Sequence, residues 1–146
     1  MEKIVINIDG GSRGNPGEGA IGAVFGDGKD KAIKKYSQAI GFCTNNEAEY
    51  KALVFALKKT KALFGKEKVK SLEIEIRSDS ELLIRQMKGE YKIQDEKIGK
   101  LFLEIWNLRI DLPKIGFVLI PREQNVLADK LVNEALDGKD KARTLF

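Results

Sequence analysis

Four acidic residues of this sequence have the surroundings expected of metal-binding carboxylates. Asp9 and Asp79 each follow a segment with the apolar alternation of a strand, whereas Glu49 and Asp129 lie in segments with helical periodicity. Oxygen ligands without His or Cys suit Mg²⁺, with Mn²⁺ as a substitute. Two such ions about 3.5–4 Å apart can activate water and stabilise the leaving oxygen during phosphodiester cleavage. If the acids converge, they predict metal-dependent hydrolysis of a nucleic acid backbone.

The first of these acids begins a glycine-rich nonapeptide, residues 9–17. Its glycines are Gly10, Gly11, Gly14 and Gly17. We expect a turn directly after Asp9, because glycine accepts positive φ and lets a ligand approach the backbone closely. Taken alone, the stretch is equally compatible with an ordinary hairpin turn.

Helical periodicity separates Glu49 from its neighbour Glu47. Glu49 lies on the apolar, core-facing stripe of its helix, whereas Glu47 lies on the polar side. The apolar stripe comprises Ala52, Leu53 and Ala56, and the polar side includes Lys51 and Lys58. Asp129 falls in the first turns of the last helix, where the positive end of the helix dipole tolerates a carboxylate. Simple charge complementarity at a helix start remains the alternative for Asp129.

The periodicity and the turn residues predict strands and helices that alternate along most of the chain. The expected strands are residues 3–8, 18–25, 31–42, 71–77 and 114–120, the last covered on both faces, with Asp27 and Gly28 joining the second and third. The expected helices are residues 46–62, 79–87, 95–108 and 125–136, with N-caps at Asn45 or Asn46, near Ser78 and at Asn125, and ends at Gly65, Gly89, Pro113 and Gly138. This order predicts an α/β domain with a mixed sheet flanked by helices. A helical crossover would make the first and fourth strands parallel, so Asp9 and Asp79 would share one end of the sheet.

Length and composition favour one domain, residues 1–146. Cys43 is the single cysteine and no apolar leader precedes the first strand, so we expect a protein of the reducing cytoplasm. No apolar run approaches the roughly 20 residues of a membrane span. The net charge of +4 is compatible with a polyanionic partner, although the lysine runs also fit solvated helix faces.

Four motifs together resemble type 1 ribonuclease H across nearly the whole chain. They are Asp9–Gly17 (DGGSRGNPG), Thr44–Tyr50 (TNNEAEY), Arg77–Ser80 (RSDS) and Pro121–Asp129 (PREQNVLAD). The resemblance implies a ribonuclease H-like fold with a five-stranded mixed sheet. It implies endonucleolytic cleavage of the RNA strand of RNA–DNA hybrids by two metal ions, leaving 3′-hydroxyl and 5′-phosphate ends. It assigns the metal-binding roles to the same four acids, Asp9, Glu49, Asp79 and Asp129.

The same resemblance suggests residues that touch the RNA–DNA hybrid. The side chains are those of Asn15, Thr44, Asn45 and Asn46. Gly10, Gly11 and Ser12 are added because a ligand can approach the backbone of the glycine-rich segment closely. Amides and hydroxyls can bond phosphates and the 2′-hydroxyl of RNA. Capping and turn chemistry is the alternative for Asn and Thr, and Asn46 could serve both purposes. No obligate protein partner is expected.

Several departures from the family limit what the resemblance carries over. The chain has no histidine, although many members place one in the loop before the last helix. One hypothesis is that Arg122 in that loop takes the place of the histidine and holds a phosphate by paired N–H donors. The alternative is that Arg122 is an ordinary solvent-exposed arginine. Residues 87–94 are too few for the basic handle of some relatives, and we expect no hybrid-binding domain before Met1. Glu81 replaces a neutral residue, which puts substrate contacts there in doubt.

Two other classes are weaker interpretations. An actin-like ATPase also begins with a strand, an acid and a glycine turn, but it needs a repeated second half. A catalytically silent nucleic-acid-binding module is the other, and a cleavage assay on a labelled hybrid separates it from a nuclease.

Overall fold

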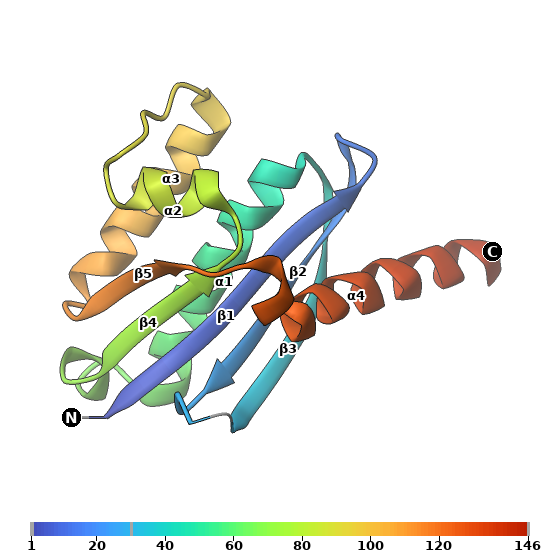
Figure 1. Ribbon diagram of the computed structural model, residues 1–146. Helices are drawn as coiled ribbons and strands as arrows, with labels where there is room; N and C mark the ends of the chain where they lie inside the picture. The colour runs from blue at the N-terminus through green and yellow to red at the C-terminus, as the bar shows by residue number, and fades with distance from the viewer. Residues whose placement is uncertain (1, 30, 146) are drawn as a thin grey trace.

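The protein folds around one mixed sheet of five strands, in the order β3-β2-β1-β4-β5 (Figure 1). A computed structural model describes residues 2–29 and 31–145, with side chains through residue 138. The strands are β1 (Lys3–Arg13), β2 (Gly17–Gly26), β3 (Ala32–Cys43), β4 (Glu73–Ser78) and β5 (Ile115–Leu119). The helices are α1 (Asn45–Phe64), α2 (Glu81–Met87), α3 (Glu96–Ile110) and α4 (Val126–Leu145), with 3₁₀ turns η1 (Lys68–Lys70) and η2 (Arg122–Gln124). The predicted α/β class and mixed sheet are confirmed.

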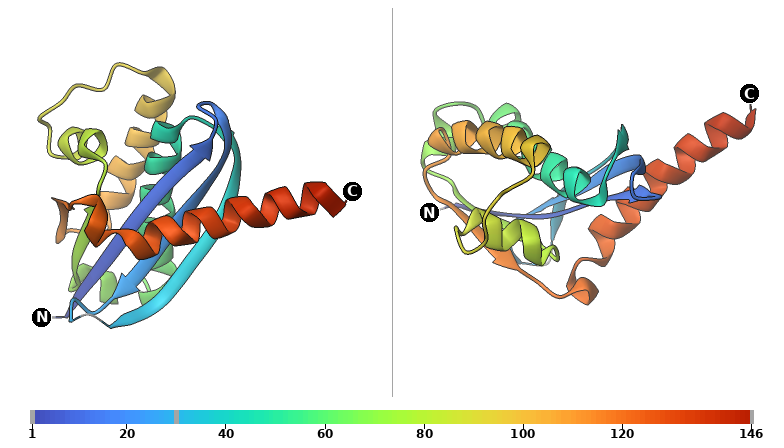
Figure 2. Two further views of the ribbon diagram at one scale, coloured as in Figure 1. Left: turned by 45° about the vertical axis from the view of Figure 1, so that its right-hand side comes forward. Right: turned by 90° about the horizontal axis from the view of Figure 1, so that it is seen from above.

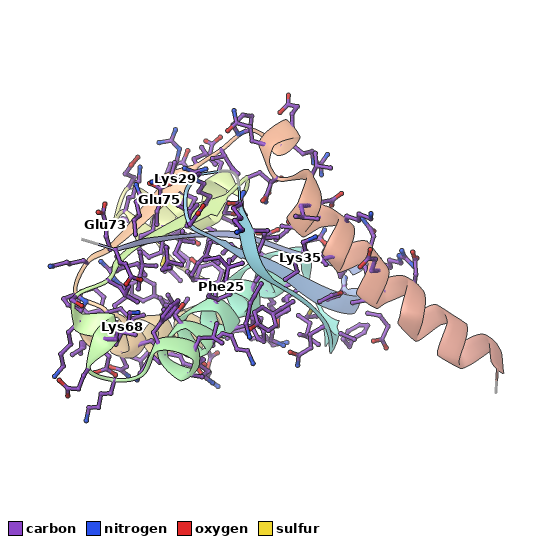
Figure 3. All side chains as sticks on the ribbon, turned by 90° about the horizontal axis from the view of Figure 1, so that it is seen from below. Phe25, Lys29, Lys35, Lys68, Glu73 and Glu75 are labelled. Atoms are coloured by element: carbon purple, nitrogen blue, oxygen red, sulfur yellow. The ribbon has the colours of Figure 1, made fainter. Side chains whose placement is uncertain are left out.

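Helices cover both faces of the sheet. Helix α1 packs against β1 with α3 beside it, and α4 crosses the opposite face over β1, β2 and β3 (Figures 1 and 2). The space between the sheet and α1 is filled with side chains, as Figure 3 shows from below. That core includes Ile6, Ile8, Leu53, Leu57 and Ile76, all fully buried. None of the described helices is long and apolar enough to cross a membrane.

The strand pairing sets the geometry of the functional edge. β1 runs antiparallel to β2 and parallel to β4, and β4 runs parallel to β5, as the helical crossover predicts. The ladder between β1 and β4 ends at the pair Asn7–Arg77. β1 continues to Arg13, paired only with β2, so its other edge is free of β4 beyond Asn7.

The expected turn directly after Asp9 is wrong. Asp9, Gly10 and Gly11 lie inside β1 and pair with β2, and the turn comes at Gly14, whose φ is +84°. Close packing against a helix, and not a turn, explains the first of these glycines. Gly10 faces α1 so closely that an added β-carbon would lie 2.3 Å from the backbone of Ala48.

Two helices begin close to the expected residues, but their N-cap residues differ from the expected ones. Thr44, not Asn45 or Asn46, is the N-cap of α1: its side chain accepts from the Glu47 N–H, and the Glu47 side chain accepts from the Thr44 N–H. That reciprocal pair is a capping box. Helix α2 begins after Ser80, whose side chain accepts from the Leu83 N–H, so Asp79 lies before the helix and not within it. Gly65 ends α1 as expected.

Two further expectations near the C-terminus are also wrong. Segment 114–120 is not covered on both faces: in β5 only Phe117 is buried, because α4 crosses β1 to β3 and leaves this edge strand bare. Helix α4 does not stop at Gly138 but runs through it to Leu145. A glycine inside a helix costs only about 1 kcal/mol relative to alanine, and Gly138 lacks the positive φ of a glycine cap. Residues 138–145 are thus helical.

Candidate active site

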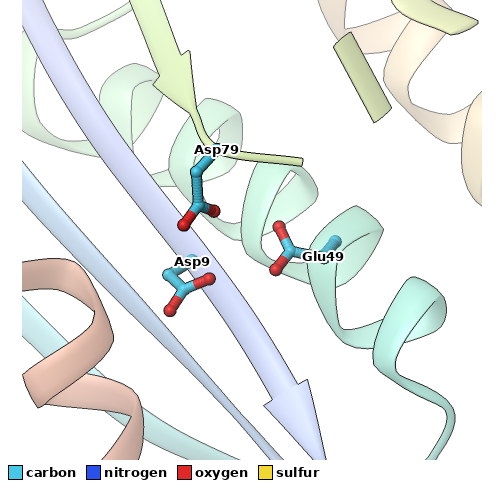
Figure 4. Close-up of side chains that lie close together, drawn as sticks. All are labelled: Asp9, Glu49 and Asp79. Atoms are coloured by element: carbon cyan, nitrogen blue, oxygen red, sulfur yellow. The ribbon is translucent and has the colours of Figure 1, made fainter. Parts of the chain in front are cut away.

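Three carboxylates from three elements meet at the edge that β1 leaves free. Asp9 comes from the middle of β1, Glu49 from the first turns of α1, and Asp79 from the segment between β4 and α2. One oxygen from each lies within 4.8 Å of the others, and the side chains point toward one another (Figure 4). The convergence follows from the register, because Asp9 and Asp79 each lie two residues beyond the Asn7–Arg77 pair.

Glu49 reaches this cluster because α1 approaches β1 very closely at Gly10. The Glu49 Oε1 atom accepts a hydrogen bond from the Gly10 N–H at 3.2 Å. The bare β-position of Gly10 admits the backbone of Ala48, so any larger residue would push the helix outward. The helical-face prediction for this acid agrees with the structure, since Ala52, Leu53 and Ala56 are all fully buried. Glu47 instead closes the capping box.

Burial and mutual repulsion make the metal-free cluster electrostatically unfavourable. Burial raises the pKa of Asp9 to about 6, an effect opposed by its hydrogen bond with Glu49 and increased by the charges of Asp79 and Asp129. Burial, followed by the charge of Asp9, raises the pKa of Glu49 well above its ordinary value. Carboxyls in this state favour a nearby positive charge.

The donor set fits a divalent cation. The Glu49 Oε2 atom is buried, and no hydrogen-bond donor of the described residues reaches it. An unsatisfied buried carboxylate oxygen is costly, and a cation beside it would remove that cost. Because all the converging atoms are carboxylate oxygens, the site suits a hard cation such as Mg²⁺ or Mn²⁺.

Asp129 lies outside the cluster of three but on the same cavity. This cavity of about 580 Å³ is lined by all four acids and by Arg122, among others. Asp129 is exposed on the first turns of α4, and its charge contributes to the raised pKa of Asp9. Its position is that of a carboxylate facing the cluster across an open cavity.

The residues expected to touch substrate divide into two groups. Gly10, Gly11, Ser12, Asn45 and Asn46 line the cavity. Asn15 and Thr44 do not line it but support the residues that do.

Hydrogen bonds show how this support is built. The Asn15 side chain accepts from the Asn45 N–H at 3.1 Å. The Asn45 side-chain oxygen accepts from the Ser12 N–H at 2.8 Å and from its hydroxyl at 3.0 Å. Capping and turn chemistry therefore accounts for Asn15 and Thr44, while within the described chain the Asn46 side chain makes no hydrogen bond and faces the cavity.

Several residues of this region were not singled out from the sequence. Arg13 and Asn133 line the cavity, and Arg13 forms an ion pair with Asp137 at 2.5 Å that links the end of β1 to α4. Asn125, expected only as a helix cap, is 1% exposed and hydrogen-bonds to β1. The polar sequence of this loop gives no indication that Asn125 is buried. Glu81 forms an ion pair with Arg85, with 3.1 Å between the Glu81 Oε1 and Arg85 Nε atoms.

Comparison with known proteins places this fold and site in a family. The family model described as "Reverse transcriptase-like" matches residues 7–135. A ribonuclease H of Clostridium botulinum is 32% identical over 158 residues, covering 94% of this chain and 97% of that protein. The crystal structure of LC11-RNase H1 in complex with an RNA/DNA hybrid is 44% identical with a TM-score of 0.89, covering 93% of this chain and 98% of that one.

Some relatives are much longer than this chain. A bifunctional protein of Mycobacterium tuberculosis is 37% identical over 137 residues, which is 93% of this chain and 36% of the relative. The chain thus spans about a third of the length of such relatives and nearly all of the compact ones. The resemblance found in its four motifs is confirmed at the level of the fold. The chain belongs to the reverse transcriptase-like family and, within it, to the type 1 ribonucleases H.

Proposed function

We propose that this protein is an endoribonuclease that cuts the RNA strand of RNA–DNA hybrids, leaving 3′-hydroxyl and 5′-phosphate ends. The observation that carries the proposal is the cluster of Asp9, Glu49 and Asp79 with an unsatisfied buried oxygen on Glu49. The hybrid bound by the similar LC11-RNase H1 supports the choice of substrate. We place the activity in the cytoplasm, where the lone cysteine, Cys43, would stay reduced.

Asp9, Glu49, Asp79 and Asp129 would hold two divalent ions, Mg²⁺ with Mn²⁺ as a substitute. Such ions supply activation of the attacking water and stabilisation of the leaving oxygen. The protein's part would be to hold the four carboxylates in place around one cavity, each fixed by its own element. Burial of Asp9 and Glu49 makes their charged forms costly without a partner, so these two carboxylates would favour cations beside them.

Substrate contacts come from the start of α1 and the loop before α4. The Asn46 amide and the Asn45 amino group face the cavity and are free to bond phosphate or sugar oxygens. Arg122 also lines the cavity, and its guanidinium would hold the scissile or departing phosphate by paired N–H donors. Lacking an imidazole, the chain would use no histidine for proton transfer.

The test is cleavage of a hybrid with a labelled RNA strand, with and without Mg²⁺. Wild-type protein should cut the RNA strand only when the metal is present, and Asp79→Asn should abolish cleavage. Glu47→Gln is the matched control, because it changes a carboxylate of α1 that caps the helix outside the cluster. Metal-independent cleavage, or full activity of Asp79→Asn, would contradict the proposal.

A further inference from the structure

Asn125 is a buried amide at the junction between β1 and the loop that carries Arg122 and Asp129. It is 1% exposed, although the residues on both sides of it are exposed. A buried amide in a polar loop is costly unless its groups are paired, so the partners reveal its task.

The side chain of Asn125 is tied to the strand that carries Asp9. Its Nδ2 atom donates to the Ile8 carbonyl at 2.8 Å, one residue before Asp9. Its Oδ1 atom accepts from the Asn7 amide at 3.4 Å. The amide therefore spans two consecutive residues of β1 on the approach to the cluster.

The backbone of Asn125 is tied to both functional residues of the loop. Its N–H donates to the Arg122 carbonyl at 3.0 Å and closes η2, and its carbonyl accepts from the Asp129 N–H at 3.1 Å in the first turn of α4. One residue thus connects the main chain beside Asp9 to the main chain of Arg122 and Asp129.

One other side-chain hydrogen bond ties this loop to β1, because the Asn7 amide donates to the Gln124 carbonyl at 3.4 Å. No residue of η2 is buried, and in the first turn of α4 Val126 is 62% exposed and only Ala128 is fully buried. The apolar contacts that hold α4 on the sheet, around Val132 and Leu136, begin further along the helix. At the first turn itself the backbone of Ala128 packs closely on Gly22 of β2, and the Asn125 amide ties this turn to the strand that carries Asp9.

We propose that Asn125 is a positioning residue that sets the place of the Asp129 carboxylate and the Arg122 guanidinium relative to Asp9. This inference rests on the proposed function, because it assigns a catalytic role to Asp129. A displacement of about 1 Å in a reacting group can cost about a hundredfold in rate. Loss of the amide should therefore affect turnover more than hybrid binding.

The first measurement is kcat and KM of Asn125→Ala on a labelled hybrid, well below its unfolding temperature. We expect kcat to fall at least about tenfold while KM stays within about twofold. The control is Leu131→Ala, which removes a buried side chain that packs α4 near Gly22 of β2 and leaves the amide intact. The Leu131→Ala variant should lose about as much stability as Asn125→Ala but keep the wild-type kcat.

The second measurement reads geometry and not activity. Mn²⁺ bound at the acid cluster broadens nearby amide signals with a steep distance dependence, so the broadening of the Asp129 N–H signal reports its distance from the metal. It should decrease in Asn125→Ala and stay unchanged in Leu131→Ala. If Asn125→Ala does not fold, Asn125→Asp, which keeps the shape but lacks the donor toward Ile8, takes its place.

Two results would overturn the inference: unchanged kcat and broadening in the Asn125 variant, or equal losses in the Leu131 control. If wild-type protein fails to cut the hybrid, the proposed function is wrong, but the Mn²⁺ broadening still decides whether Asn125 places Asp129.

Discussion

Replacing Asp9 by Asn should make the metal-free protein more stable while abolishing its activity. Asp9 is 7% exposed, and burial together with the charges of Asp79 and Asp129 raises its pKa from the ordinary 3.8 to about 6. A carboxyl with a raised folded pKa destabilises the fold when it is ionised. The amide of Asn keeps the shape, carries no charge, and can donate to the unsatisfied Glu49 oxygen.

The magnitude and the pH window follow from these two pKa values. The destabilisation is small below pH 4, grows as the pH rises from 3.8 through about 6, and is complete above pH 7. A pKa difference of this size corresponds to about 3 kcal/mol at pH 8 and to about 0.6 kcal/mol at pH 4. For a domain of this size, 3 kcal/mol is a rise in Tm of about 8 °C.

The assay is urea unfolding of wild type and Asp9→Asn in EDTA between pH 4 and pH 8. The variant should gain about 2–3 kcal/mol at pH 8 and only about 0.6 kcal/mol at pH 4. Exposed Glu123→Gln serves as a control for the removal of a charge outside the cluster. Mg²⁺ should raise the Tm of wild type and not that of the variant, because only wild type gains by binding it. A variant no more stable than wild type at pH 8, or a gain independent of pH, would refute the electrostatic reasoning.

Four further outcomes test other parts of the site. Glu49→Gln should lose most activity, about a hundredfold or more, whereas Glu47→Gln should keep it, because Gln can still close the capping box; comparable losses in cleavage assays would contradict the placement of the two acids. Arg122→Ala should lower kcat about tenfold, roughly 1.4 kcal/mol, with only partial recovery in Arg122→Lys, and wild-type rates at saturating hybrid would exclude a catalytic part. Asn46→Ala should raise KM severalfold with little change in Tm; an unchanged KM would remove it from the substrate surface. Gly10→Ala should cost several kcal/mol in urea unfolding, since its β-carbon would overlap the first turn of α1, and wild-type stability would show that this helix shifts freely.

The parts of the fold that were predicted correctly depend on local periodicity. Alternation identified β1 and β4, and the stripe of small and apolar residues beside Glu49 identified the buried side of α1. The helical crossover then made β1 and β4 parallel, which brought Asp9 and Asp79 to one edge. Three of the four acids could be placed together without any knowledge of tertiary contacts.

The parts that were missed depend on contacts between distant segments. Gly10 was taken for a turn residue, because nothing local shows that the backbone of Ala48 will approach its β-position. Asn125 was placed correctly at the start of the last helix, but the task of its side chain was missed, because its partner, the Ile8 carbonyl, is 117 residues away. Polar residues in loops satisfy either local or distant groups with the same chemistry, and only the tertiary structure decides between them.

The register of β1 against β4 accounts for the rest of the site. Beyond the Asn7–Arg77 pair, β4 no longer pairs with β1, and β1 continues alone on this edge. The N–H of Gly10 is therefore available to Glu49, and the space beside Asp9 is open to Asp79. Ile6 and Ile8 face the core beneath α1, and Asp9 belongs to the other face, which it shares with Asn7. A slip of one residue would exchange these faces, directing Asp9 toward the apolar core and Ile8 toward the cavity. The burial of the isoleucines therefore fixes the register, and that register in turn places the acid.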